Sequence, residues 1–245
     1  MSRGDMLARR APADRGRIQV VSGDLPSAPS AIAGYCWDLD PELGITYGAG
    51  GAGAGLVAAM SDQSPSAVHV AQATGSLQPT RVVADASFNG HDSIDHSVLD
   101  ANLAVSASLG IRHIFCVAKH PLTTFGTYAC LLTSTSANPW SPVWLGDSGN
   151  ANWRLDGFEV PGTFLRDGVV TGAALSAANA AHAYERVFTA LKTTSTWMVG
   201  HQTPVQFPGR QWGGRWARII GFNLPVVGTD LVWLRAYLQQ RYGTP

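Results

Sequence analysis

Short segments rich in β-branched and aromatic residues recur along the chain from about residue 35, and glycine, proline, asparagine or aspartate separates each from the next. The segment Ile111–Lys119 is the strongest candidate for a central strand, because no residue in it disfavours a strand. Strands at this spacing, with no helical periodicity between them, predict antiparallel sheets packed as a sandwich. The 27 glycines, 14 prolines and charged fraction of only 14% fit many short strands joined by turns.

The same patterns predict the remaining strands and one long loop. With 245 residues, the chain is long enough for one large sandwich with a sizeable core. The segment Gly44–Gly55 is so rich in glycine and alanine that we expect an extended loop there. Further strands are expected at Tyr35–Leu39, Val68–Ala73, Arg81–Val83, Ser87–Ile94, Tyr128–Thr133, Phe158–Leu165, Arg186–Leu191, Thr196–Val199 and Trp216–Phe222.

The C-terminal segment predicts a short amphipathic helix that closes one end of the sandwich. Thr229 is the expected N-cap, Asp230 favours the first turn through the helix dipole, and Gly243 ends the helix. Apolar side chains on one face are expected to pack into the core: Trp233, Leu234, Tyr237 and Leu238.

Residues 1–30 differ from the rest and are interpreted as an arm or linker, while residues 31–245 form the sandwich domain. The pattern at Arg17–Val21 fits a short strand, but the segment otherwise indicates either a disordered tail or an arm that orders against a partner surface. The basic residues assigned to partner binding are Arg3, Arg9, Arg10, Arg15 and Arg17, opposed by Asp5 and Asp14.

Charge and cysteine content exclude several classes of protein. The formal net charge is zero, so no global basic field recruits nucleic acid. Cys36, Cys116 and Cys130 are widely spaced and odd in number, which predicts no disulfide framework and no thiolate metal cluster. The first residues lack the apolar core of a secretory signal, and no run of about 18 apolar residues predicts a membrane span. We therefore expect synthesis in a host cytoplasm.

Several short motifs follow one another in a fixed order along the chain. They are Trp37–Asp40, Asp62–Ser64 with Ala71–Ala73 and Pro79, Phe88–Ile94, Ile111–Lys119, Phe164–Val169, Val199–Gly200 with Trp212–Phe222, and Tyr237–Gly243. In this order they resemble the concanavalin A-like lectin/glucanase superfamily, in particular its laminin-G-like jelly-roll modules of bacterial and phage type. The resemblance covers roughly residues 35–243 and implies an all-β, two-sheet antiparallel jelly-roll sandwich. Arg218 stands where the family usually has an acid, and Pro65 where an early turn usually has glycine.

The acidic residues do not form the pattern of a glycoside hydrolase, in which two carboxylates flank one glycosidic bond. No two of Glu42, Glu159 and Glu185 are close in sequence. Asp92 and Asp95 would point to opposite faces of a strand, and the resemblance puts the pair Asp38 and Asp40 on the entry strand. A composite pair from distant strands stays open as an alternative.

Other catalytic patterns are equally incomplete. The segment Gly146–Gly149 matches the sequence around a serine-protease nucleophile, but no histidine has the matching context. The histidines do not have zinc-binding spacing either. We therefore expect no enzymatic activity, no catalytic residues and no metal centre.

One loop has the composition of a carbohydrate site, because aromatic rings stack on sugars while amides and carboxylates bind hydroxyls. The alternative is that these tryptophans fold back onto the sandwich, as we expect for Trp212 and Trp216. Oxygen ligands for calcium are available from three residues of the loop, Asp147, Asn150 and Asn152. The candidate glycan-binding residues are Trp140, Trp144, Asp147, Asn150, Asn152 and Trp153.

Together these patterns favour a non-enzymatic structural or binding protein. The first hypothesis is a bacteriophage virion component, a capsid decoration or head- or tail-associated protein that the basic arm anchors to other virion proteins. The alternatives are a carbohydrate-binding lectin module that recognises cell-surface glycans and, second, a glycoside hydrolase. A homo-oligomer is compatible with all three hypotheses. Fold alone does not decide among them.

Overall fold

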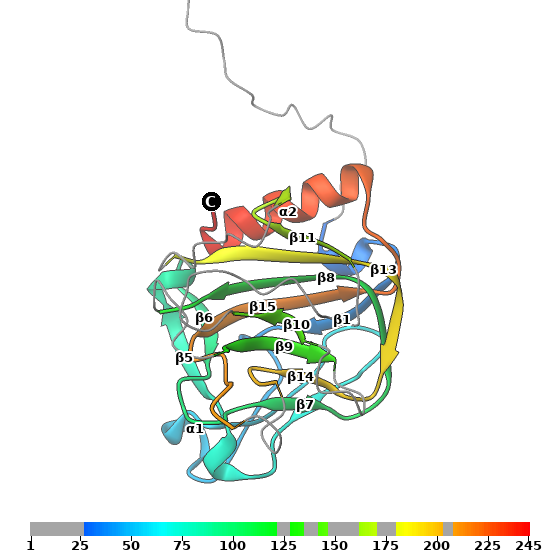
Figure 1. Cartoon of the computed structure of the whole chain (residues 1–245). Helices are drawn as coiled ribbons and strands as arrows, with labels where there is room; N and C mark the ends of the chain where they lie inside the picture. The colour runs from blue at the N-terminus through cyan, green and yellow to red at the C-terminus, as the bar shows by residue number, and fades with distance from the viewer. Residues whose placement is uncertain (1–26, 122–127, 135–141, 147–161, 171–179, 203–207) are drawn as a thin grey trace, which may run out of the picture.

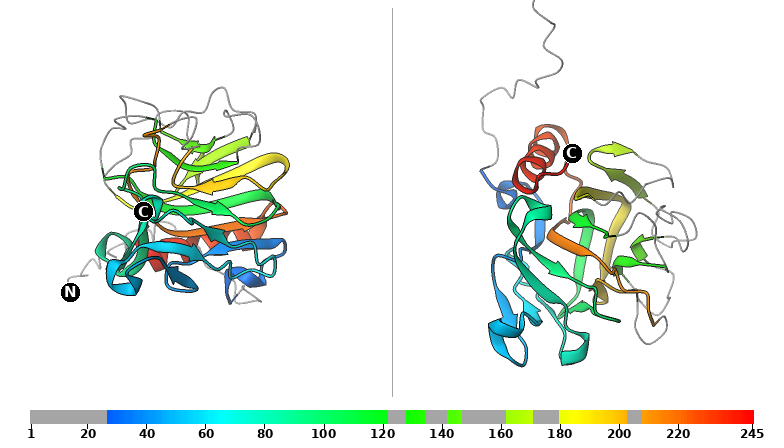
Figure 2. Two further views of the ribbon diagram at one scale, coloured as in Figure 1. Left: turned by 90° about the horizontal axis from the view of Figure 1, so that it is seen from below. Right: turned by 90° about the vertical axis from the view of Figure 1, so that its left-hand side faces the viewer.

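A computed structural model of the chain describes residues 27–121, 128–134, 142–146, 162–170, 180–202 and 208–245. Across these ranges, a pair of antiparallel β-sheets pack face to face, and the C-terminal helix α2 (Gly228–Tyr242) lies along the outer face of one of them (Figures 1 and 2). The predicted fold class, an all-β two-sheet sandwich with a short C-terminal helix, is confirmed. The candidate strand Arg17–Val21 lies outside the described residues.

The sheet that carries helix α2 is named the first sheet. Its strands follow the order β12-β11-β13-β8-β15-β6-β5, and β1 pairs with β15 beside this path. Their bounds are β1 (Tyr35–Leu39), β5 (Thr80–Asp85), β6 (His91–Asp95), β8 (Leu109–Lys119), β11 (Gly162–Arg166), β12 (Val169–Val170), β13 (His182–Thr194) and β15 (Arg215–Phe222).

The second sheet has the order β10-β9-β14-β7-β4-β3-β2, and its strands are shorter. Short helical segments occupy several turns: η1 (Pro29–Ala31), α1 (Gly51–Ala54), η2 (Gly75–Leu77) and η3 (Ala86–Phe88). The strands are β2 (Ile45–Tyr47), β3 (Val57–Met60), β4 (Val70–Ala71), β7 (Leu103–Val105), β9 (Cys130–Ser134), β10 (Pro142–Leu145) and β14 (Trp197–Val199).

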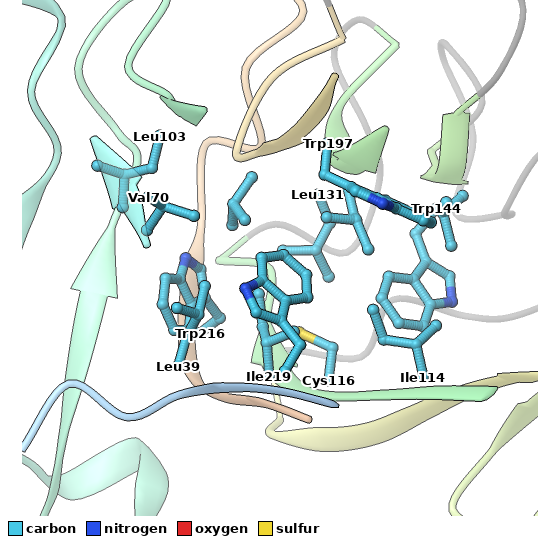
Figure 3. Close-up of a cluster of buried hydrophobic side chains, with 14 of the residues drawn as sticks. Leu39, Val70, Leu103, Ile114, Cys116, Leu131, Trp144, Trp197, Trp216 and Ile219 are labelled. Carbon is cyan, nitrogen blue, oxygen red and sulfur yellow. The ribbon is translucent and has the colours of Figure 1, made fainter. Parts of the chain in front are cut away.

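The main core fills the space between the two sheets and is rich in tryptophan. Figure 3 shows Trp144 and Trp197 next to one another, with Trp216 beside Leu39. Most of these indoles find a partner for the ring N–H: Trp37 donates to the Val68 carbonyl at 3.1 Å and Trp197 to the Leu109 carbonyl at 2.9 Å. The predicted burial of Trp212 and Trp216 is confirmed, since both are 0% exposed. Large rings with satisfied N–H groups suit a closely packed core.

A second core lies between the first sheet and helix α2. Along β8, Ile114 and Cys116 face the second sheet, whereas Phe115 and Val117 face the helix. Both faces of β8 are therefore buried, which explains why Ile111–Lys119 contains so few polar residues. The thiol of Cys116 is buried, and burial raises its pKa well above the usual value, so it packs as an apolar group.

Helix α2 confirms the predicted packing face and one of its two predicted ends. Leu234, Leu238 and Tyr242 are buried, and Trp233 and Tyr237 pack partly buried beside them. The prediction that Thr229 caps the helix is wrong, because the helix already begins at Gly228 and its N-cap, Val227, makes no side-chain capping bond. At the other end, Gly243 adopts φ +66° and its N–H bonds to the Gln239 carbonyl, as predicted.

The segment Gly44–Gly55 differs from the extended loop that we expected. Ile45–Tyr47 forms the edge strand β2, which pairs with β3, and Gly51–Ala54 forms the short helix α1. The glycines with positive φ lie outside the strand: Gly44 precedes it, and Gly50, Gly51 and Gly55 follow it. Cross-strand pairing with β3 stabilises a conformation that local composition does not favour.

A buried ion-pair network attaches the entry strand β1 to the centre of the first sheet. The Arg218 guanidinium pairs with both Asp38 and Asp40, and its Nη2 donates to Asp38 at 2.7 Å. The Arg218 side chain is only 8% exposed. Burial raises the pKa of Asp38, although Arg218 opposes the shift. The arginine at this position is therefore matched by two carboxylates, Asp38 in the neighbouring strand β1 and Asp40 directly after it.

We predict that Arg218→Met lowers the free energy of unfolding by about 3–5 kcal/mol, because it leaves two buried carboxylates without their cation. The matched control is Arg241→Met, which removes the more exposed pair with Glu42 and should cost at most about 1 kcal/mol. Urea unfolding of both variants measures the difference. An equal decrease in the free energy of unfolding of both variants would show that the buried ion pairs of Arg218 stabilise the fold no more than the exposed pair of Arg241.

His96 is held neutral by two hydrogen bonds inside the core. Its Nδ1 donates to the Ala101 carbonyl at 3.0 Å, and its Nε2 accepts the Trp216 indole N–H at 3.0 Å. A second proton would point at the indole N–H. Burial lowers the pKa of His96 to about 4, although the bond to Ala101 opposes the shift.

This arrangement predicts acid sensitivity. Because the pKa of His96 is lower in the folded state than in the unfolded state, its contribution to stability is complete above about pH 6.5 and is lost towards pH 4, by roughly 3 kcal/mol. Thermal unfolding of the wild type and His96→Gln across this range tests it: the stability advantage of the wild type should shrink as pH falls. An advantage that stays constant from pH 7 to pH 4 would refute the assignment.

Candidate functional site

A polar cleft of about 440 Å³ opens where the carboxyl ends of β6 and β8 meet the first residue of β15 and the turn η3. In Figure 1 this is the side of the first sheet on which β5 and β6 are labelled, where β8 ends and β15 begins. The volume lies in the range of small-ligand sites. We call it the rim cleft; its lining residues are Ser87, Asp95, Ser97, Lys119, Pro121, Gly213, Gly214 and Arg215.

Arg215 forms one wall of the rim cleft and is fixed by two acids. Its Nε donates to Asp95 at 2.9 Å and its Nη1 to Asp85 at 3.2 Å. Asp85 is buried behind it, while 40% of the Arg215 side chain stays exposed. The guanidinium is therefore held in one orientation, with a free edge towards solvent.

Lys119, the last residue of β8, supplies the second cation. Its Nζ donates to the Ser87 hydroxyl at 3.0 Å. Among the residues that the structure describes, Lys119 has no carboxylate partner. The rim cleft thus contains an ammonium group with two N–H donors beyond the one that bonds to Ser87.

Two adjacent glycines, Gly213 and Gly214, line the rim cleft and place no side chains in it. Gly213 adopts φ +65°, and a Cβ on Gly214 would lie 2.4 Å from the Lys119 carbonyl oxygen. The Gly214 carbonyl accepts the His96 N–H at 3.0 Å, which ties the turn to the strand β6. This close approach brings Arg215 to the end of β8, beside Lys119.

The aromatic support beneath the rim cleft comes from Trp212 and His120. Trp212 is fully buried, and its ring lies 5.0 Å from the His120 ring in an edge-on arrangement. These residues are not accessible from the rim cleft side as a stacking platform, because Trp212 is 0% exposed. The rim cleft therefore offers charges and hydroxyls to a ligand.

Asp85, the buried acid behind Arg215, does not have the raised pKa that a general acid needs. Burial alone would raise the pKa of Asp85, but hydrogen bonds from Ser93, Ser87 and Arg215 outweigh it and lower the pKa. A general acid in glycoside hydrolysis needs a raised pKa. The acid whose pKa is raised, Asp38, lies against Arg218 in the interior.

The predicted glycan loop is described only partially. Trp144 is 1% exposed and packs in the main core, so we correct its assignment: the ring folds back onto the sandwich and is not accessible to a glycan. The other candidates, Trp140, Asp147, Asn150, Asn152 and Trp153, lie outside the described residues, as do the arm residues Arg3, Arg9, Arg10, Arg15 and Arg17. These assignments, including the calcium ligands, stay predictions.

Sequence analysis did not find the rim cleft. Its residues come from three separate segments, 87–97, 119–121 and 213–215, which only the pairing of β6, β8 and β15 brings together. Two weak signals were present: a lysine directly after the apolar run Ile114–Ala118, and an arginine directly after two glycines. Neither signal indicates a site unless the pairing of Lys119 with Arg215 across β8 and β15 is already known.

Comparison of the chain with protein-family models, curated protein sequences and solved structures found no match. The resemblance to concanavalin A-like modules therefore stays a prediction. Within the described ranges, no cluster of three or more histidine, cysteine or acidic side chains is placed to hold a metal ion. The helices in those ranges are too short or too polar to cross a bilayer.

We predict that Gly214→Ala destabilises the protein by about 1–3 kcal/mol, because the added Cβ would overlap the Lys119 backbone. Gly75→Ala is the matched control, since a Cβ there meets nothing within 4 Å, and should change stability by less than about 0.5 kcal/mol. Thermal unfolding compares the two variants. If Gly214→Ala were as stable as the control, the close approach at the floor of the rim cleft would be incorrect.

Proposed function

We propose that this chain is a non-enzymatic structural and binding protein, a component of a bacteriophage virion, in which a rigid β-sandwich presents the rim cleft and the N-terminal segment provides attachment. The observation that carries the proposal is that the buried acidic side chains form ion pairs and hydrogen bonds within the fold. Among the described residues the buried acids are Asp38, Asp40, Asp62, Asp85, Asp92 and Glu185.

Five of these six acids pair with a cationic or histidine side chain. Arg218 binds Asp38 and Asp40, Arg215 binds Asp85, and Arg81 binds Asp92. Glu185 accepts bonds from His113 at 3.0 Å and from Arg235 at 2.9 Å. Their carboxylates stabilise the packing, and this supports binding in preference to hydrolysis.

Asp62 differs from the other five, because its carboxylate accepts backbone N–H groups. It bonds to the N–H groups of Asp38, Ser64 and Val68 at 2.8–2.9 Å. It thereby joins the entry strand β1 to the segment that leads to β4. This use of a carboxylate organises backbone and leaves no oxygen directed at a ligand.

Attachment to a virion is the element of the proposal that rests on sequence. Its supports are the resemblance to modules common in phage proteins and the excess of arginine over acid in residues 1–17. Basic segments of this composition commonly order on a partner surface. The partners would be other virion proteins.

A lectin function is the second candidate, and the rim cleft favours it. Sugar hydroxyls both donate and accept hydrogen bonds, and the rim cleft offers Asp95 as an acceptor next to the cations Lys119 and Arg215. The two candidates are compatible, because a virion protein with such a cleft would bind glycans on a cell surface. Fold alone would not separate them.

The attachment proposal predicts that deletion of residues 1–26 removes the protein from particles while leaving the sandwich folded. The deletion ends before Ser27 because Pro29 is already buried and Ile32 belongs to the second core. Occupancy on particles purified from the producing host, and the Tm of the free protein, are the two measurements. A second variant, with glutamine at Arg3, Arg9, Arg10, Arg15 and Arg17, separates charge from length. Full occupancy of both variants would contradict the proposal.

A further inference from the structure

We propose that the rim cleft binds a saccharide that carries a carboxylate group, and that Lys119 is the residue that holds this carboxylate. The inference rests on the proposed binding function and gives it a ligand class. Three features of the rim cleft lead to it: the position of Lys119, the balance of its charges, and the polarity of its opposite wall.

Lys119 is positioned to receive an anionic group. Its Nζ makes one hydrogen bond, to the Ser87 hydroxyl at 3.0 Å, although an ammonium group has three N–H donors. Ser87 is itself fixed, because its backbone N–H donates to Asp85 at 2.9 Å. The Lys119 side chain is thus held at one place while donors remain for a ligand. The exposed edge of Arg215 lines the same cleft.

The distribution of charges leaves Lys119 as the group that can accept a negative charge, because Arg215 already pairs with Asp85 and Asp95 whereas Lys119 bonds only to the Ser87 hydroxyl. Two cations, Lys119 and Arg215, share this region with two carboxylates, Asp85 and Asp95, so the four groups sum to zero. A doubly charged phosphate would bring more negative charge near both acids, and a neutral sugar would leave the ammonium group without an ionic partner.

The opposite wall suits hydroxyl groups. Asp95 accepts the Ser97 N–H at 2.7 Å and Arg215 at 2.9 Å, each on a different oxygen, and each oxygen keeps a second lone pair. Ser97 is exposed beside it. Of the lining side chains that belong to the described residues, only Pro121 is apolar. A ligand with many hydroxyls and one carboxylate per unit, such as a uronic acid oligomer, matches both walls.

The sequence provides a matched control, because the chain contains only two lysines, Lys119 and Lys192. Lys192 lies in β13 and does not line the rim cleft. The variants Lys119→Gln and Lys192→Gln therefore remove the same charge from two different places. Lys119→Arg keeps a positive charge in the rim cleft and reports whether the charge itself is required.

The experiment is isothermal titration of the full chain with oligomers of galacturonic, glucuronic and mannuronic acid, with galactose oligomers of equal length as the neutral probe. The inference predicts that the wild type prefers the acidic oligomer, that Lys119→Gln weakens this binding about tenfold or more, and that Lys192→Gln and Lys119→Arg largely retain it. Added salt should weaken the binding as well. The Tm of each variant confirms that it is folded.

Three outcomes would overturn the inference. The first is no binding of galacturonic, glucuronic or mannuronic acid oligomers by the wild type. The second is an equal loss of affinity for the acidic oligomer in Lys119→Gln and Lys192→Gln. The third is an affinity for the acidic oligomer that is unchanged in Lys119→Gln. Binding of neutral oligomers alone would also reject the carboxylate while leaving the lectin candidate intact, and particle attachment through residues 1–26 is measured independently of all these results.

Discussion

The strands β8 and β15 pair along most of their length, and each is covered on both faces. On one side lies the tryptophan-rich core that joins the two sheets, and on the other lies helix α2. Burial on both faces fixes the register of these strands, because a shift by one residue would exchange the side chains of two different cores. The positions of β1 through Arg218, of β6 through His96 and Trp216, and of the rim cleft all follow from this pair.

The rim cleft is a direct product of that register. Lys119 ends β8, and Arg215 begins β15, and these two residues are cross-strand partners. The turn Gly213–Gly214 then passes close to the β8 backbone without side chains to fill the space. Charged groups placed on strand ends of a rigid sheet lose little freedom when a ligand binds. The rim cleft is in this sense prepared for binding before a ligand arrives.

Much of the fold followed from sequence because its strongest signals are local. The strand Ile111–Lys119, the buried Trp212 and Trp216, and the end of the helix at Gly243 were all predicted. The strand β3, Val57–Met60, was missed because its two alanines have little strand preference and its pairing partners stabilise it. The rim cleft was missed because register alone joins Lys119 to Arg215. Trp144 was assigned to a glycan because composition does not show which way a ring points.

The central claim, that the chain binds a ligand in the rim cleft without converting it, can be tested by one NMR measurement. A carbon-13 label at the Cε atom of lysine gives a separate CH₂ signal for Lys119 and for Lys192 and leaves both ammonium groups unchanged. On titration with a galacturonic acid oligomer, the account predicts that the Lys119 signal shifts, that the Lys192 signal does not, and that the oligomer is recovered intact. A shift at Lys192 alone, or a shortened oligomer, would contradict it.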